Sequence, residues 1–191
     1  MVATREIRVF GDPVLRQVTP QVTEIDGALV RLAQDMIETI YEVPGRAGLA
    51  APQVGVERRL FVYDGPDGPT VIVNPVISES RGEWLYEEGC LSVPGMAFEI
   101  VRPKEVYLTG IDLDGNDVAV EADEFLARLY QHEVDHLDGI LLLDRLDGDQ
   151  RREAMRVLRE RTWQEGPAAP RQPEGAGGTA AAPAGVPGAS A

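Results

Sequence analysis

Cysteine and histidine are scarce in this 191-residue chain, which has one Cys and two His. A single cysteine, Cys90, excludes an intramolecular disulfide and leaves three roles open: a core residue, a reactive thiol or a metal ligand. Long apolar runs are also absent, since no stretch reaches the roughly 18 residues that a membrane-spanning helix needs. Arg5, Glu6 and Arg8 stand near the N-terminus with no secretory apolar segment after them. We therefore expect a cytoplasmic protein without a membrane partner.

Basic residues are outnumbered, with 18 Lys and Arg against 32 Asp and Glu and a net charge of −14. Such a surface repels nucleic acid, which excludes general nucleic-acid binding. Residues 150–163 are the exception, because five arginines against two glutamates give that segment a charge of +3.

Large apolar side chains are nearly missing from residues 166–191, of which nine are Ala, six Gly and five Pro. This segment buries too little surface to offset its chain entropy, so we predict a disordered tail there. Residues 1–165 are then predicted to form the folded domain.

Apolar residues at three- and four-residue spacing predict helices, and short apolar runs bounded by turn residues predict strands. The predicted helices cover residues 22–42, 121–139 and 149–163. The predicted strands cover residues 60–63, 71–73, 106–111 and 118–120. Strands in the middle of the chain with helices before and after them predict an α+β domain.

Both histidines fall in the sequence QHEVDH, on the second predicted helix. The spacing of His132 and His136 puts both imidazoles on one helix face, where they can chelate one metal ion, with Glu133 nearby as a base. Two histidines on a helix by chance are the alternative. With the thiolate of Cys90 the set has three ligands and an open position, as in catalytic sites, although a buried inert Cys90 also fits the count.

Three segments in this order resemble signature motifs of the peptide deformylases. They are GLAAPQ at residues 48–53, EGCLS at residues 88–92 and QHEVDH at residues 131–136. Shorter pieces also match, namely DPVLR at 12–16, Asn74-Pro75 and Arg102-Pro103. The resemblance covers about residues 5–163.

This resemblance implies small antiparallel or mixed sheets packed around a central helix that carries the metal motif, plus a C-terminal helix. It implies a catalytic domain of residues 1–165 that removes the N-formyl group from the formyl-methionine of nascent polypeptides and releases formate. Cys90, His132 and His136 would hold one divalent metal per chain. This donor set suits Fe2+, Zn2+, Ni2+ or Co2+, and the resemblance favours Fe2+ in the cell.

The resemblance also assigns catalytic roles. Glu133 would take a proton from the attacking water and deliver it to the leaving amine. The Gln53 side-chain amide and the Leu91 backbone N–H would stabilise the developing oxyanion. The alternative for Gln53 is a solvated loop residue. Asp135 is interpreted either as a partner that orients a ligand or Arg102, or as a solvated or structural acid.

Substrate contacts follow from the same resemblance. The substrate backbone would pair with Ala47, Gly48, Leu49 and Gly89 like an added strand. The methionine pocket would draw on Tyr86, Leu126 and Leu129, of which both leucines fit a plain core role equally well.

Two departures from the family pattern stand out. Arg46 occupies the place of a usual glycine, and Gly45 before it is expected to make the turn one residue early. Met96-Ala97 stands where some relatives carry an arginine, which is expected to weaken contacts with the downstream peptide.

The basic helix 150–163 is interpreted as a ribosome-docking element, as in some family members; its alternative is pairing with the acidic body. Two other function classes stay open. An HExxH peptidase normally takes its third ligand downstream of the motif, unlike Cys90. A binding module without activity would need neither Glu133 nor Gln53.

Overall fold

The computed structural model describes the backbone of residues 3–165 and the side chains of residues 3–160. In this range the helices are α1 (Gly27–Tyr41), α2 (Glu124–Leu137) and α3 (Gly148–Glu165). The strands are β1 (Gly48–Ala50), β2 (Leu60–Gly65), β3 (Gly68–Arg81), β4 (Trp84–Gly89), β5 (Ala97–Arg102), β6 (Glu105–Ile111) and β7 (Asp117–Asp123). Chain contacts define one unit, Met1–Met155, and a second, Arg156–Ala191. The predicted tail, residues 166–191, lies outside the described residues.

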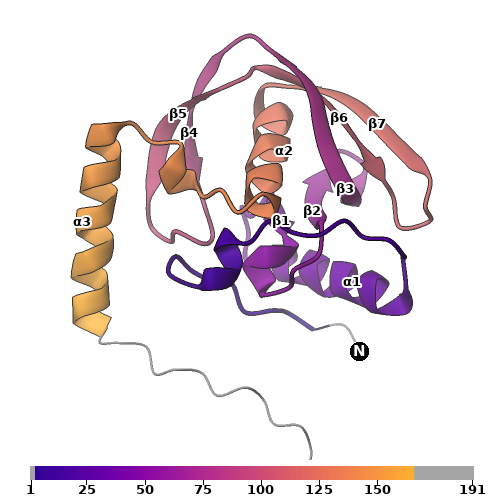
Figure 1. The fold of residues 1–191 in the computed structure, drawn as a ribbon, viewed down its shortest axis with the longest axis horizontal. Helices are drawn as coiled ribbons and strands as arrows, with labels where there is room; N and C mark the ends of the chain where they lie inside the picture. Colours follow the sequence, from indigo (N-terminus) through magenta and orange to yellow (C-terminus); the bar gives the residue numbers. More distant parts are fainter. Residues whose placement is uncertain (1–2, 166–191) are drawn as a thin grey trace, which may run out of the picture. The chain divides into compact units, whose positions relative to one another are not determined.

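Two antiparallel sheets and a central helix build the first unit. Five strands pair in the order β1-β2-β3-β6-β7, and β4 pairs with β5. Figure 1 shows α2 in the middle of this unit, with the β4–β5 hairpin on one side of it and the larger sheet on the other. The predicted α+β class, with sheets around the motif-bearing helix and a C-terminal helix, is confirmed.

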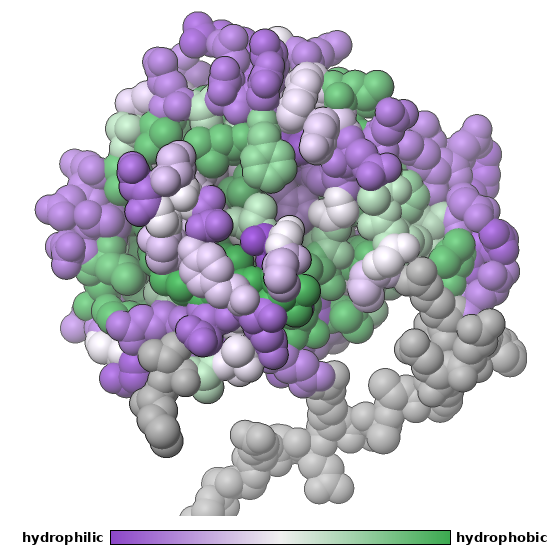
Figure 2. Space-filling view, turned by 180° about the vertical axis from the view of Figure 1, so that it is seen from behind, coloured by the Kyte–Doolittle hydropathy of each residue, from purple (hydrophilic) through white to green (hydrophobic). Residues whose placement is uncertain are grey.

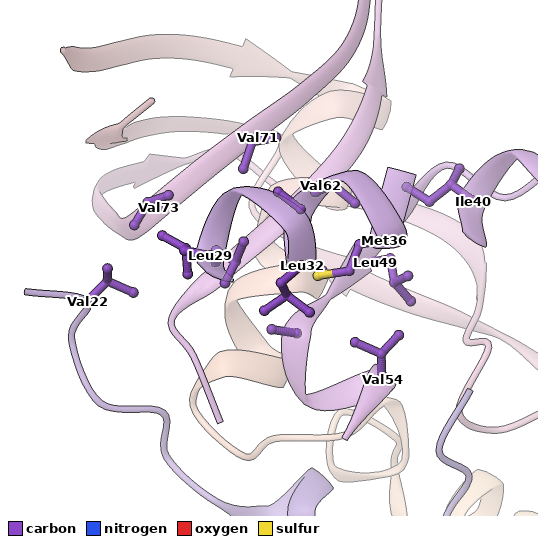
Figure 3. Close-up of a cluster of buried hydrophobic side chains, with 13 residues drawn as sticks. Val22, Leu29, Leu32, Met36, Ile40, Leu49, Val54, Val62, Val71 and Val73 are labelled. Atoms are coloured by element: carbon purple, nitrogen blue, oxygen red, sulfur yellow. The ribbon is translucent and has the colours of Figure 1, made fainter. Parts of the chain in front are cut away.

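The larger sheet has an apolar cluster on each face, because side chains alternate along a strand. Leu49, Val62 and Val73 lie in the cluster of α1, whose Leu29, Leu32, Met36 and Ile40 contribute to it (Figure 3). Their sequence neighbours Ala50, Phe61, Tyr63 and Ile72 belong to the other cluster, with Leu129, Tyr130 and Leu137 of α2. The helix that carries both histidines is therefore fixed to the sheet by its apolar face.

Helix starts differ from the predictions because local hydrogen bonds decide them. α1 begins at Gly27 and not at residue 22, since the Asp26 carboxylate accepts the Leu29 N–H at 2.8 Å as an N-cap. The backbone of Val22 is engaged elsewhere, with the side-chain amide of Asn74 at 2.8 and 2.9 Å. α2 begins at residue 124 and not 121, because residues 117–123 pair with β6 as β7.

The predicted strands are confirmed within longer ones, and β1, β4 and β5 are strands that the periodicity did not predict. Figure 2 shows one face of the molecule, on which hydrophobic residues are interspersed among hydrophilic ones. Tyr86 and Phe125 are two large side chains that remain about half exposed. No helix within residues 3–165 is long and apolar enough to cross a membrane.

Candidate metal centre

Cys90, His132 and His136 converge on one point from two elements. Cys90 directly follows β4, and the two histidines lie one turn apart on α2. The His136 Nε2 atom lies 3.3 Å from Cys90 Sγ and 3.2 Å from His132 Nε2. One ligand atom of each residue lies within 4.8 Å of the other two. The predicted three-residue set is thus assembled in the fold.

This spacing suits a single divalent metal. Metal–ligand bonds of about 2.0–2.1 Å for imidazole and 2.3 Å for thiolate at tetrahedral angles put neighbouring ligand atoms roughly 3.3–3.6 Å apart. The observed separations of 3.2 and 3.3 Å are close to that range. Three protein ligands leave a fourth position for a reactant, as in catalytic sites. The residues present therefore fit one metal, while the identity of the metal is not fixed by them.

Charge within the cluster favours the ligand form of the cysteine. Burial alone would raise the pKa of the Cys90 thiol, but the adjacent His136 and His132 hold that pKa well below its ordinary value. Burial would lower the pKa of His132, and the Cys90 thiolate raises it well above its ordinary value instead. A thiolate is the form of cysteine that binds metals.

Glu88 orients the imidazole of His132 through the ring nitrogen that faces away from the cluster. The His132 Nδ1 atom lies 2.7 Å from Glu88 Oε1, which leaves Nε2 directed at the cluster. Arg102 donates to both Glu88 oxygens, at 2.8 and 2.7 Å, and Arg128 Nη1 also donates to this carboxylate. Burial would raise the pKa of Glu88, but His132 and Arg102 hold it well below the usual range.

The ion pairs continue away from the cluster. Arg102 Nη1 donates to Asp135 Oδ2 at 2.8 Å, and Arg145 also binds Asp135. Arg102 is one of the two partners that the sequence analysis suggested for Asp135. Arg128 was not singled out from sequence, although it stands among apolar residues on α2. A cation buried on an apolar helix face needs an acidic partner, and this rule could have indicated Arg128 from the sequence.

Glu133 is buried beside the cluster on the same helix. Its Oε2 atom has no hydrogen-bond partner within the described part of the chain. Burial raises the pKa of Glu133 to about 7, although His132 and His136 act in the opposite direction. On the other side stands Gly48, where an added Cβ would lie 2.6 Å from Glu133 Oε1. The space that the Glu133 carboxylate occupies is thus available because Gly48 has no side chain.

Gln53 lies inside the site and is almost fully buried, unlike a solvated loop residue. It belongs to a short 3-10 helix, η2 (Ala51–Val54), and its Nε2 atom lies 3.9 Å from Cys90 Sγ. The backbone N–H of Leu91 donates to no acceptor among residues 3–160. The structure therefore brings the amide of Gln53 to the cluster and leaves the N–H of Leu91 available beside it.

A cavity of about 800 Å³ opens next to the cluster. Of the predicted substrate-binding residues it is lined by Ala47, Gly48, Tyr86, Gly89 and Leu129. Two predicted residues do not line it. The side chain of Leu49 is fully buried in the α1 cluster, and Leu126 packs against the α2 cluster. Pro94, Gly95, Met96 and Ala97 add to the wall.

The first departure from the motif is accommodated by the turn. Gly45 has a φ of +88°, so the chain turns there, one residue early, as predicted. Arg46 lines the cavity, and its Nη1 atom donates to the Thr39 carbonyl at 2.7 Å. That bond satisfies a carbonyl near the end of α1.

Among the α3 side chains that the structure describes, Arg151, Arg152 and Arg156 have nearby acidic partners. Arg151 Nη1 lies 3.3 Å from Asp144 Oδ1, and Arg156 Nη1 lies 2.6 Å from Glu160 Oε1. Arg151, Arg156 and Glu160 are each at least half exposed, so water and salt screen both pairs.

Comparisons with known proteins identify the family. A family model described as polypeptide deformylase matches residues 4–152. A peptide deformylase of Acidothermus cellulolyticus is 47% identical over 161 residues, which cover 84% of this chain and 89% of the relative. A crystal structure of a peptide deformylase from Legionella pneumophila has a TM-score of 0.79 and 38% identity, and the match covers 87% of this chain and 100% of that one. Another, from Ehrlichia chaffeensis in complex with actinonin, has a TM-score of 0.77 and 34% identity, with coverages of 84% and 98%. The chain belongs to the polypeptide deformylase family.

Proposed function

We propose that this site hydrolyses the formyl amide at the N-terminal formyl-methionine of nascent polypeptides. One observation carries the proposal: a buried carboxylate, Glu133, lies beside a three-ligand metal cluster at the wall of a cavity. In the reaction the oxygen of water bonds to the formyl carbon, and the bond from that carbon to the methionine nitrogen breaks. The products are formate and a free amine.

Cys90, His132 and His136 would hold the metal, and we propose iron(II) as the metal used in the cell. The bound cation would activate the attacking water and polarise the formyl oxygen. A thiolate with two imidazoles also accepts zinc, cobalt or nickel, so the donor set does not select the metal. Metal analysis of protein purified from cells without oxygen tests this part of the proposal, and a predominance of zinc would contradict it.

Glu133 would transfer the proton between water and the leaving amine. Its Oε2 atom has no partner within residues 3–160, which leaves that oxygen available to accept a proton beside the cluster. Gln53 and Leu91 would stabilise the negative charge that develops on the formyl oxygen. Loss of one such donor typically raises the barrier by about 2.7–4 kcal/mol.

The substrate backbone would pair with β1. β1 is the outermost strand of its sheet, so one of its edges is open. The Asp64 N–H donates to the Ala47 carbonyl at 2.9 Å, which points Ala47 toward β2. Backbone groups alternate in direction along a strand, so the N–H and C=O of Gly48 face the open edge. An extended peptide on that edge has its reacting end beside Glu133.

Formate release from formyl-Met-Ala-Ser tests the function. We expect release by the wild type purified anaerobically with iron(II), collapse of release in Glu133→Gln, and full release in the exposed control Glu57→Gln. Actinonin, which is bound in the Ehrlichia chaffeensis structure, is expected to inhibit the reaction. No release by folded, metal-loaded protein would contradict the proposal, and cleavage of unformylated casein would favour a peptidase.

Substrate chemistry suggests where the protein acts. Nascent formylated chains leave ribosomes in the cytosol, so we place the reaction there, with α3 as a docking element. The arginine-rich sequence of residues 150–163 supports this partner, and the exposed ion pair of Arg156 with Glu160 leaves that arginine open to exchange of partners. Replacing Arg152, Arg156 and Arg159 by glutamine is expected to lower co-sedimentation with ribosomes at low salt without changing cleavage of a short formyl peptide. Unchanged co-sedimentation would refute docking through α3.

A further inference from the structure

We infer that Ser92 is a positioning residue that holds the side-chain amide of Gln53 in its reactive orientation. The N-terminal segment 7–10 is hydrogen-bonded both to η2, which carries Gln53, and to the turn that carries Ser92. The inference rests on the proposed function, because it concerns the group that would stabilise the oxyanion.

The orientation of the Gln53 amide is set by its two ends. Its Oε1 atom accepts the backbone N–H of Ala50 at 2.9 Å. Its Nε2 atom therefore points the other way, where it donates to Ser92 Oγ at 3.3 Å and lies 3.9 Å from Cys90 Sγ. In the reversed amide, the NH2 group of Gln53 would face the Ala50 N–H, and two hydrogen-bond donors would meet. The partners therefore specify one orientation of the amide.

Ser92 occupies one of the two Nε2 hydrogens. The serine is fully buried, and Gln53 is nearly so. With one hydrogen fixed on Ser92 Oγ, the second hydrogen is directed to the side of Cys90, where the formyl oxygen would develop its charge. A donor held in place before the reaction costs no reorganisation during it. Without the hydroxyl, the amide loses this anchor and a buried N–H loses its acceptor.

The backbone of the N-terminal segment is hydrogen-bonded to η2 and to the turn that contains Ser92. The Arg8 N–H donates to the Gln53 carbonyl at 2.7 Å, and the Phe10 N–H donates to the Ser92 carbonyl at 2.8 Å. Alternate residues of an extended segment present their N–H groups on one edge, which explains why these two act together. The side chains between and before them, Val9 and Ile7, line the cavity. Residues 7–10 thus contribute side chains to the cavity wall and backbone hydrogen bonds to Gln53 and Ser92.

A purely structural role is the alternative, because Ser92 lies in a turn closed by the Val93 N–H and the Cys90 carbonyl at 3.0 Å. A double-mutant cycle separates the two roles. If Ser92 acts through Gln53, Ser92→Ala lowers kcat about tenfold with KM unchanged within twofold. On the Gln53→Ala background, the same substitution changes kcat less than twofold.

The cycle is measured on full-length, iron-loaded protein with formyl-Met-Ala-Ser. Metal content and the unfolding midpoint are measured for each variant, and the exposed Ser78→Ala serves as the control. Ser92→Thr, which keeps the hydroxyl, is expected to restore kcat toward that of the wild type. A tenfold loss on both backgrounds, or no loss on the wild-type background, would overturn the inference.

A spectroscopic measurement covers the case in which Ser92 variants do not fold. In zinc-loaded wild-type protein, the two Nε2 hydrogens of Gln53 are expected to give separate resonances, one of them slow to exchange with water. Gln53→Ala identifies the pair by its disappearance. Two rapidly exchanging hydrogens would refute the anchoring by Ser92, even in protein that releases formate normally. Absence of formate release would instead contradict the proposed function.

Discussion

Replacing Gly48 with alanine tests whether the missing side chain at this position makes room for the Glu133 carboxylate. The added Cβ would lie 2.6 Å from Glu133 Oε1 and 3.1 Å from Glu133 Cδ, where ordinary contacts begin at about 3.4 Å. The backbone of Gly48 has no positive φ, so alanine is compatible with the strand. The strain therefore falls on the carboxylate of Glu133 and not on the fold.

The size of the effect follows from these distances. The carboxylate has to move by about 0.8 Å to reach an ordinary contact. A displacement of about 1 Å in a reacting group costs on the order of 100-fold in rate, which corresponds to about 2.7 kcal/mol. We expect Gly48→Ala to lower kcat by about that factor, with metal content unchanged.

Steady-state formate release from formyl-Met-Ala-Ser measures the effect. Gly148→Ala is the matched control, since its Cβ would make an ordinary contact of 3.6 Å outside the cavity. A kcat for Gly48→Ala within twofold of the wild type would refute the reasoning. A rise in KM with an unchanged kcat would instead place the role of Gly48 in substrate binding.

Three further perturbations probe the ligands and the fold. Glu88→Gln is expected to weaken metal binding by about 10- to 100-fold, since the carboxylate orients His132; competition with a chelator measures this, and unchanged affinity would contradict the role. Removal of the metal with a chelator should abolish formate release, and added iron(II) should restore it; activity that survives complete removal would exclude a metal-dependent reaction. Asp144→Asn is expected to lower the free energy of unfolding by about 1 kcal/mol at pH 7. Burial would raise the pKa of Asp144, but the hydrogen bonds from Arg16 and the Leu141 N–H, together with the charges of Arg16 and Arg151, lower it. The stabilisation is therefore present above the ordinary carboxyl pKa of about 3.9 and is lost as the pH falls through the lowered value. Denaturation series at several pH values check this, and a difference that persists at pH 2 would contradict it.

The metal cluster was predictable from the sequence because its chemistry is concentrated in few residues. Both histidines stand four residues apart on a helix, so their approach follows from helix geometry alone. Cys90 reaches them only through the packing of β4 against α2, and here the motif resemblance supplied what periodicity did not. The α+β class followed from the order of helices and strands.

Long-range polar contacts could not be predicted in the same way. Arg102 and Arg128 are separated from Glu88 along the sequence. Only the folded structure shows that both arginines form buried ion pairs with the Glu88 carboxylate. Leu126 and Leu129 are both apolar residues of α2. They point in different directions around the helix axis, and of the two only Leu129 lines the cavity. The starts of α1 and α2 were missed because a side-chain cap and a strand pairing set them.

The open edge of β1 has a consequence for self-association. An unpaired strand edge that would accept a peptide also offers a template for a second copy of the protein. β1 has only three residues, and η2 with Pro52 follows at once. The free edge thus offers little beyond the two backbone groups of Gly48, too few to hold another folded chain. In the proposed complex an extended peptide would gain its remaining contacts inside the cavity, so the short strand would admit the substrate while limiting aggregation.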